Sequence, residues 1–296
     1  MSTLFYTAAN RGYWHFAPLY IYFVLSANED WAVEVGLEDA EDFKAEYAAA
    51  LRILNTCFAG RFKITDIDFA GRIPGVVRFL EEPTFERDRD YIYIGDIDIL
   101  ILDDDIEQLH ITNMAKNGLP FSNKLRPLRE LDAGRRLTGL QFAPMSLQYP
   151  LPDISDLDTS AENTLLGADE HILYEMMIRK GVMVPETATF RPEHGIHISR
   201  GRHPFGTRKD GRNLKFDFEE IRKKNQSVAW SNIHKLPYRE KLTERFADPL
   251  FRELYFELDL AARNLVMILE NIIAERFEEF YSEAQLYITG KQKPPK

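Results

Sequence analysis

The segment YIYIGDIDIL (91–100) brings two aspartates, Asp96 and Asp98, to the end of an apolar run. Residues i and i+2 of a strand point to the same face, so two negative charges would stand side by side. Buried carboxylates are costly unless something pairs with them. Mg²⁺ and Mn²⁺ favour such oxygen ligands and commonly share them with substrate phosphates. The pair therefore predicts a metal and diphosphate site; the alternative is a solvated strand end that continues into the acidic turn at 103–105.

Histidines and basic residues gather in a second segment that could serve this chemistry. RPEHGIHISRGRHPFG (191–206) holds three of the seven histidines, together with Arg200 and Arg202, which could hold phosphates. We favour His197 as a metal ligand, and His194 is the competing candidate. A lone histidine in a protein is more often a structural residue than a metal ligand. The identity of the histidine ligand therefore stays open at this point.

Acidic and basic side chains elsewhere are weaker candidates. Asp169 and Glu170 stand at the start of GADEHILYEMMIRKG (167–181), an expected helix, where acids are favourable with or without a functional role. Arg78 lies on a short expected helix, as either a ligand contact or a surface residue. Three basic residues before LTGLQF (137–142) are further candidates for phosphate contact: Lys124, Arg126 and Arg135.

Strands and helices alternate along the first hundred residues. The patterns predict strands over 4–10, 31–37, 61–69 and 91–100, and helices over 13–26, 39–58 and 72–82. This alternation predicts an α/β domain with a mostly parallel central sheet. Ligands of such sheets bind beyond the carboxyl ends of the strands, which is where Asp96 and Asp98 fall. An apolar stripe over 251–272 predicts a C-terminal helix, packed on the main domain or, alternatively, in a homodimer.

Composition excludes several classes of protein. The chain has 296 residues and a net charge of -10, which argues against nonspecific nucleic-acid binding. The single cysteine, Cys57, excludes an intrachain disulfide and a cysteine zinc cluster. We find no signal peptide, and apolar stretches fall short of the ~20 residues of a membrane span, so we expect a soluble cytoplasmic protein. The run 200–224 holds nine Lys or Arg against four acids, which indicates a solvated face or a peripheral contact with an anionic acceptor or the inner membrane face.

The order of these segments over residues 4 to 205 resembles GT-A glycosyltransferases, most closely glycosyltransferase family 8, the group of glycogenin and bacterial lipopolysaccharide galactosyltransferases. TAANRGY (7–13) is similar to the opening strand and nucleotide-contacting turn of this family. The resemblance implies that Ala8, Asn10 and Tyr13 border the base and ribose of a nucleotide. RIPGVVRFL (72–80) resembles the helix that offers an arginine, here Arg78, to the donor.

The remaining motifs lie in the second half of this region. YIYIGDIDIL is similar to the metal strand of the family, which implies that Asp96 and Asp98 bind metal and that Asp96 also faces the donor. GADEHIL (167–173) resembles the helix start near the anomeric carbon, which implies catalytic roles for Asp169 and Glu170.

The last motif, HISRGRHPF (197–205), is similar to H-x-x-G-x-x-K-P-W of the family. It implies that His197 is a metal ligand and that Gly201 and His203 contact the diphosphate. This sequence departs from the pattern because Gly201 comes four residues after His197, His203 stands in place of Lys, and Phe205 in place of Trp. Thr138 likewise replaces an Asn-Ser element, and Glu170 replaces Gln.

Together the resemblance implies a GT-A nucleotide-sugar-binding domain over 1–206, followed by a basic linker and helical extension over 207–296. It implies transfer of a galactose- or glucose-type hexose from a UDP-sugar, with Mn²⁺ or Mg²⁺ and retention of configuration. The acceptor would be a saccharide or a lipid-linked saccharide in bacterial surface polysaccharide synthesis. Two alternatives stay open: a metal-dependent phosphohydrolase with Asp96 as nucleophile, and a GT-A domain that binds a nucleotide or saccharide without turnover.

Overall fold

The computed structural model describes residues 2–85, 88–128, 134–163, 165, 167–198, 205–206, 215–216, 232–276 and 279. The chain divides into two compact units, Met1–His194 and Gly195–Lys296. The division that we predicted after residue 206 falls among residues that are only partly described, and it stays a prediction. No helix in the described part of the chain is long and apolar enough to cross a membrane.

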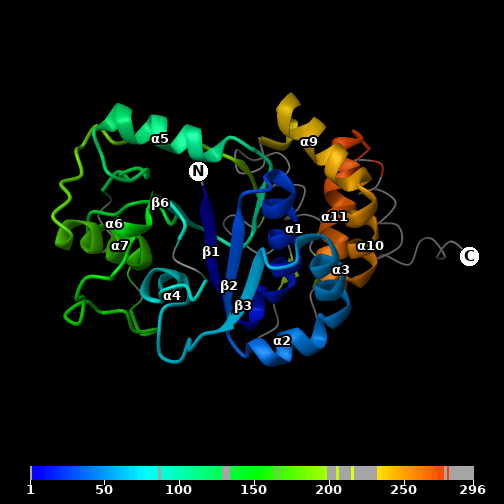
Figure 1. Ribbon diagram of the computed structural model, residues 1–296, viewed down its shortest axis with the longest axis horizontal. Coiled ribbons are helices and arrows are strands. Elements are labelled where there is room, and N and C mark those ends of the chain that lie inside the picture. Colours follow the sequence, from blue (N-terminus) through cyan, green and yellow to red (C-terminus); the bar gives the residue numbers. More distant parts are fainter. Residues whose placement is uncertain are drawn as a thin grey trace, which may run out of the picture. The chain divides into compact units, whose positions relative to one another are not determined.

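A five-stranded sheet forms the centre of the first unit, in the order β3-β2-β1-β4-β6. Its strands are β1 (Thr3–Ala9), β2 (Ala32–Leu37), β3 (Phe62–Asp66), β4 (Tyr91–Ile94) and β6 (Gln141–Pro144). The first four run parallel, and β6 pairs with β4 in the antiparallel sense. Figure 1 shows β1, β2 and β3 side by side. The expected α/β fold with a mostly parallel central sheet is therefore confirmed.

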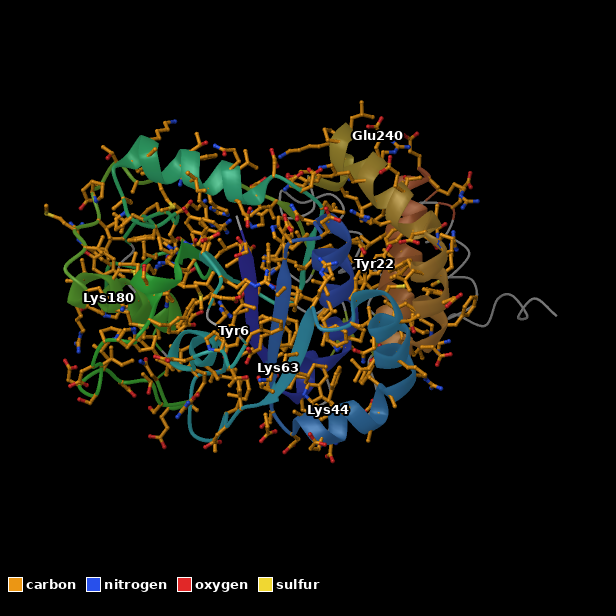
Figure 2. The ribbon with its side chains drawn as sticks, viewed as in Figure 1. Tyr6, Tyr22, Lys44, Lys63, Lys180 and Glu240 are labelled. Atoms are coloured by element: carbon orange, nitrogen blue, oxygen red, sulfur yellow. The ribbon has the colours of Figure 1, made fainter. Side chains whose placement is uncertain are left out.

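Helices cover the centre of this sheet because β1 and β2 are buried on both faces. Every residue of β1 and β2 is buried, as expected for parallel strands with helices on either side. Side chains such as Tyr6 and Tyr22 are fully buried inside the unit, whereas Lys63 is exposed (Figure 2). The helices of the unit are η1 (Arg11–Phe16), α1 (Ala17–Ala27), α2 (Ala40–Glu46), α3 (Ala48–Phe58), α4 (Pro74–Leu80), α5 (Ile106–Asn117), α6 (Met145–Gln148) and α7 (Ala168–Arg179).

Two of these helices connect the sheet to the candidate site. α4 packs against β1 and against α7. Their shared core contains Phe79 from α4, Ile172 from α7, and Leu4 and Ile92 from β1 and β4. Full burial of each large apolar side chain of this kind stabilises the folded protein by roughly 1.5–3 kcal/mol. The pairing of α4 with α7 therefore fixes the residues that both helices present beyond the ends of the strands.

The segment around the aspartate pair differs from the expected single strand over 91–100. β4 ends at Ile94, β5 (Ile99–Ile101) begins five residues later, and Asp96 and Asp98 lie in the turn between them. Gly95 allows this turn because a Cβ there would lie 2.7 Å from the Tyr93 ring. Its carbonyl also accepts a hydrogen bond of 2.9 Å from Thr7 Oγ1 of β1. The two carboxylates therefore do not share one face of a strand, contrary to our expectation, although both residues follow the end of β4 closely.

The second unit contains the C-terminal helices α9 (Leu236–Ala247), α10 (Pro249–Glu257) and α11 (Leu260–Ile273). It also contains β7 (Gly195–His197) and the antiparallel pair β8 (Phe205–Gly206) and β9 (Lys215–Phe216). The expected helical extension is confirmed, but its apolar stripe is divided between two helices. The first helix ends before Leu258. The Asp259 side chain then caps the start of α11, because it accepts a hydrogen bond of 2.8 Å from the backbone N–H of Ala262.

Candidate functional site

The aspartate pair lies at the carboxyl end of β4, and its two members are buried to different degrees. Asp98 is 5% exposed, whereas the Asp96 side chain is 33% exposed. Tyr13 lies close to both carboxylates. Burial, together with the negative charges of Asp98 and Asp96, raises the pKa of Tyr13 to about 12. The end of β1 and the turn after β4 thus meet at one place, as the parallel sheet requires.

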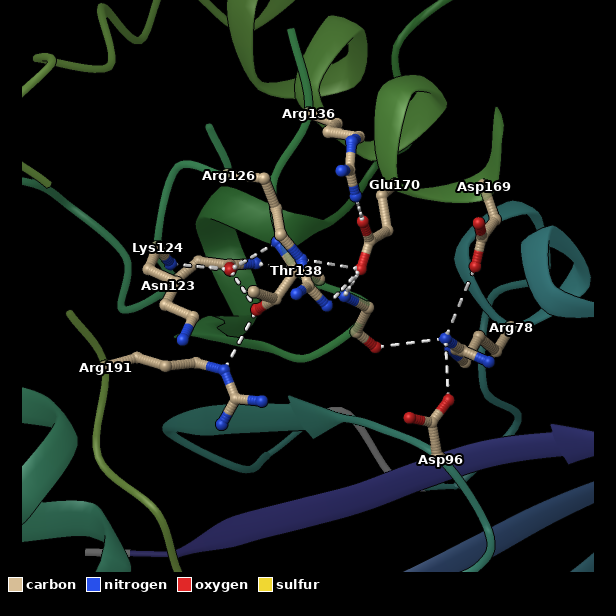
Figure 3. Close-up of polar contacts among 11 residues, drawn as sticks. Arg78, Asp96, Asn123, Lys124, Arg126, Arg136, Thr138, Asp169, Glu170 and Arg191 are labelled. Carbon is tan, nitrogen blue, oxygen red and sulfur yellow. Dashed lines mark hydrogen bonds and ion pairs between the residues drawn. The ribbon is translucent and has the colours of Figure 1, made fainter. Parts of the chain in front are cut away.

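Arg78 links this turn to α7. Its Nη2 atom lies 2.9 Å from Asp96 Oδ1 and 3.8 Å from Asp169 Oδ2 (Figure 3). The same nitrogen donates a hydrogen bond of 3.1 Å to the Gly139 carbonyl. The Arg78 side chain is only 8% exposed, and its Nε atom has no hydrogen-bond partner among the described residues. One buried guanidinium therefore holds three chain segments together, and Asp169, Asp96 and Arg78 form the centre of the site.

Two glycines allow these close approaches. A Cβ at Gly139 would lie 2.7 Å from Arg78 Nη2, and a Cβ at Gly75 would lie 2.9 Å from Asp169 Oδ2. Neither glycine has a positive φ. They are needed for space, not for an unusual backbone conformation. Gly75 thus leaves room for Asp169 beside α4, and Gly139 leaves room for the Arg78 guanidinium that contacts both Asp169 and Asp96.

Glu170 has a different environment from its neighbour Asp169. Arg126 donates two hydrogen bonds to Glu170 Oε1, from Nε at 3.2 Å and from Nη2 at 2.8 Å. Arg136 donates to Glu170 Oε2, and the Gly139 N–H donates to Oε1 at 3.2 Å (Figure 3). The Glu170 carboxylate thus joins two arginines and the 137–142 segment to the start of α7. The catalytic roles expected for Asp169 and Glu170 stay predictions.

A second set of polar contacts fixes the 137–142 segment from the other side. Asn123 Oδ1 accepts hydrogen bonds from the Thr138 N–H at 3.0 Å and from Thr138 Oγ1 at 2.6 Å. Arg191 Nε donates to Thr138 Oγ1 at 2.9 Å. Sequence reasoning missed Asn123, Arg136 and Arg191 as members of this region. Arg191 lies in the segment that we selected for its histidines, so only its basic character could have drawn attention to it.

The residues expected near a nucleotide base lie at the end of β1 and in the segment that follows it. Ala8 is 8% exposed within β1, and Asn10 is the first residue after this strand. The Asn10 carbonyl accepts a hydrogen bond of 2.9 Å from the Tyr13 N–H. Its side-chain Oδ1 atom is buried and has no hydrogen-bond partner in the described part of the chain. Asn10 thus has a free acceptor close to Tyr13, and base and ribose contacts for these residues stay predictions.

The competing metal candidate, His194, lies in a buried polar cluster of the first unit. His194 Nε2 and the Tyr93 hydroxyl are 2.5 Å apart. The ring of His110 lies 5.3 Å from that of His194, and its Nδ1 atom is 2.7 Å from Ser122 Oγ. Both histidines are buried, and Tyr93 and His110 are close neighbours of His194. The alternative role of His194 as a metal ligand stays a prediction.

This cluster predicts a dependence of stability on pH. Burial and the charge of Arg191 lower the pKa of His110 to about 3. Burial, His110 and Arg191 hold the pKa of His194 well below its usual range. Below about pH 6.5 the unfolded chain therefore takes up protons that the folded chain does not bind, and stability falls as pH falls. We expect the free energy of unfolding in urea to decrease by roughly 1.4 kcal/mol for each histidine between pH 7.5 and 5.5. His110→Asn should remove about half of this decrease, and an unchanged profile would contradict the assignment.

Three further predicted residues belong to the second unit. His197 belongs to β7 of the second unit, and its role as a metal ligand stays a prediction. Gly201 and His203 lie outside the described residues, as does most of the basic run 200–224. Contacts of these residues with a diphosphate, an acceptor or a membrane therefore also stay predictions.

Comparisons with known proteins return likenesses among solved structures alone. No family model matches the chain, and no curated protein matches it. An active-site mutant of LgtC shares 18% identity over 57% of this chain and 68% of that one, with a TM-score of 0.38. The glycosyltransferase GlyE of Streptococcus pneumoniae shares 12% identity over 92% of this chain and 64% of that one, with a TM-score of 0.42. A 4-diphosphocytidyl-2C-methyl-D-erythritol synthase of Anaerococcus prevotii shares 6% identity over 79% of this chain and 99% of that one, with a TM-score of 0.39. The matched region of GlyE is less than two thirds of its length, and likenesses of this size do not assign an activity to this chain.

Proposed function

We propose that this protein is a metal-dependent glycosyltransferase of the GT-A type that moves a hexose from a UDP-sugar to a saccharide or lipid-linked acceptor. The observation that carries the proposal is the convergence of Asp96, Arg78 and Asp169 beyond the carboxyl end of β4, next to Tyr13. The sequence resemblance to glycosyltransferase family 8 supports the same activity, with retention of anomeric configuration. A role in bacterial surface polysaccharide synthesis and the galactose or glucose type of the donor belong to this proposal as well.

The residues of the turn after β4 suit a hard divalent cation. Carboxylate oxygens are the ligands that Mn²⁺ and Mg²⁺ prefer, and Asp98 is a carboxylate that is almost fully buried. In this proposal Asp96 and Asp98 bind the metal, with His197 as a third ligand. The bound metal would stabilise the charge that develops on the leaving diphosphate.

The protein side chains would then orient and enclose the donor. Arg78 supplies a buried positive charge beside Asp96, which suits a diphosphate oxygen. Asp169, which lies 3.8 Å from Arg78, would accept hydrogen bonds from sugar hydroxyls in this proposal. Asn10, with its free buried Oδ1 atom, can accept a hydrogen bond from a ribose hydroxyl or a base N–H.

Calorimetric titration of UDP, with and without Mn²⁺, tests this proposal on the wild type and on Asp96→Ala/Asp98→Ala. We expect binding that requires both the metal and the two aspartates. Absence of UDP binding to the wild type in the presence of Mn²⁺ would overturn the proposal. Release of phosphate from simple esters would favour the phosphohydrolase, and UDP binding without donor consumption would favour a domain that binds without turnover.

The substitution Gly139→Ala tests the position of Arg78. The added methyl group would lie 2.7 Å from Arg78 Nη2, so the guanidinium must shift and its contacts with Asp96 and the Gly139 carbonyl should weaken. We expect UDP affinity in the presence of Mn²⁺ to fall by about tenfold, which corresponds to one lost charge-assisted hydrogen bond. If the methyl group acts through Arg78, then Gly139→Ala/Arg78→Ala should bind UDP no more weakly than Arg78→Ala alone. Additive losses would contradict this explanation.

A further inference from the structure

Arg191 differs from the other arginines around the candidate site. Its Nε atom donates to Thr138 Oγ1 at 2.9 Å, and its Nη1 atom donates to the Pro192 carbonyl at 3.1 Å. The side chain is half-buried, and it forms no ion pair with any carboxylate of the described residues. By contrast, Arg78 pairs with Asp96, and Arg126 and Arg136 pair with Glu170. The Arg191 guanidinium is thus the positive charge of this group that has no carboxylate partner.

The Arg191 guanidinium lies on the part of the candidate site that also contains Asp96. Figure 3 shows its guanidinium and the Asp96 carboxylate on the same side of the segment that carries Thr138. Burial lowers the pKa of Arg191, and the positive charge of Arg126 lowers it further, whereas Tyr93, Asp96 and Glu193 act in the opposite direction. Asp96 is therefore near enough to influence Arg191 without pairing with it. A half-buried guanidinium that has no carboxylate partner is suited to an anionic carboxylate or phosphate, to which its remaining N–H groups can donate charge-assisted hydrogen bonds.

We propose that Arg191 binds an anionic group of a substrate, a carboxylate or a phosphate carried by a sugar, in addition to the diphosphate of the donor. This inference rests on the proposed function, because it takes the turn with Asp96 and Asp98 as the place of that diphosphate. If Arg191 binds such a group, then the donor or the acceptor of the transfer is an acidic sugar. The anion belongs either to the transferred sugar, as in a uronic acid, or to the acceptor.

Binding measurements on matched variants distinguish these two sources. Arg191→Gln removes the charge and retains a side chain that can donate to Thr138, and Arg52→Gln makes the same change at an exposed position of α3. UDP, UDP-glucose and UDP-glucuronate are titrated into each protein with Mn²⁺. Glucose, glucuronate and glucose 6-phosphate are then titrated into each protein, alone and in the presence of saturating UDP.

A preference of about tenfold or more for UDP-glucuronate over UDP-glucose, lost in Arg191→Gln, would place the anion on the donor. The same preference for glucuronate or glucose 6-phosphate over glucose, also lost in Arg191→Gln, would place it on the acceptor. Arg52→Gln should behave as the wild type throughout. The result that overturns the proposal is no preference for any acidic ligand, or an equal loss of affinity for UDP itself in Arg191→Gln, because Arg191 would then hold the diphosphate.

Failure of the proposed function gives a separate result. A wild type that binds no UDP would overturn the glycosyltransferase assignment. The titrations of glucuronate and glucose 6-phosphate without UDP would still decide whether Arg191 binds an acidic sugar. An acidic ligand that raises the melting temperature of the wild type but not that of Arg191→Gln supports the anion site, and equal shifts in both proteins overturn it.

Discussion

Replacing Asp98 by asparagine is expected to lower Mn²⁺-dependent turnover of a UDP-sugar by roughly 100- to 1,000-fold, which corresponds to the loss of several kcal/mol of metal-derived stabilisation. Asparagine has the shape of aspartate, so the turn between β4 and β5 should keep its conformation. The change removes one of the two negative charges that would attract the cation. It should therefore also weaken binding of Mn²⁺ itself, which can be measured by the amount of free metal in an equilibrium titration.

Asp104→Asn provides the matched control for this prediction. Asp104 is an exposed residue of the acidic turn that follows β5, so the same loss of one charge occurs a few residues from the site. We expect this variant to keep both its Mn²⁺ affinity and its turnover. Equal losses in the two variants would indicate a general charge effect. Unchanged Mn²⁺ affinity in Asp98→Asn would remove Asp98 from the metal site.

Sequence patterns predicted the regular parts of the first unit closely. The strand expected over 4–10 is β1 (Thr3–Ala9), and that expected over 31–37 is β2 (Ala32–Leu37). These strands are buried on both faces, so they appear in the sequence as continuous apolar runs. The helix expected over 167–181 is α7 (Ala168–Arg179), and its acidic start and basic end are typical of helix termini.

Breaks that depend on distant residues were not predictable in this way. The helix expected over 39–58 is two helices, α2 and α3, which meet at Tyr47. The strand expected over 91–100 is interrupted at Gly95, where Thr7 of β1 and the Tyr93 ring determine the conformation. Neither break contains a proline. The isoleucines around Asp96 and Asp98 continue the pattern of a strand, so the turn cannot be recognised from the sequence.

In the candidate site, too, single residues could be selected from the sequence, whereas contacts between distant residues could not be predicted. Asp96, Asp98 and Asp169 could be selected because each stands beside a recognisable strand or helix terminus, and Arg78 because its segment resembles a helix of glycosyltransferase family 8. Arg136 and Glu170 are 34 residues apart, and Arg191 and Thr138 are 53 apart. Such pairs meet only through the packing of α7 and the 137–142 segment. The sequence could therefore indicate the chemistry of the site but not which charges neutralise one another.

Replacement of Glu170 by alanine is expected to destabilise the protein far more than replacement of Asp169. The Glu170 side chain is 11% exposed and joins Arg126 to Arg136, whose side chain is 4% exposed. Glu170→Ala leaves both guanidinium groups without their shared carboxylate, and breaking a buried pair of this kind costs about 3–5 kcal/mol. It also removes the acceptor for the Gly139 N–H. We expect a large decrease in the free energy of unfolding in urea, and a loss of turnover that follows from the altered 137–142 segment.

Asp169→Ala should have little effect on stability and a large effect on turnover. Its side chain is 27% exposed, and its Oδ2 atom lies 3.8 Å from Arg78, so the lost ion pair is worth about 1 kcal/mol or less. Because Asp96 still holds Arg78 in place, a loss of turnover in this variant would come from the missing carboxylate. Glu170→Gln keeps the shape of the side chain and removes its charge. It therefore distinguishes the effect of the lost charge from the effect of the lost side-chain volume. If Glu170→Ala proved as stable as the wild type but inactive, Glu170 would act in the chemistry, and the structural role that its two arginines indicate would be wrong.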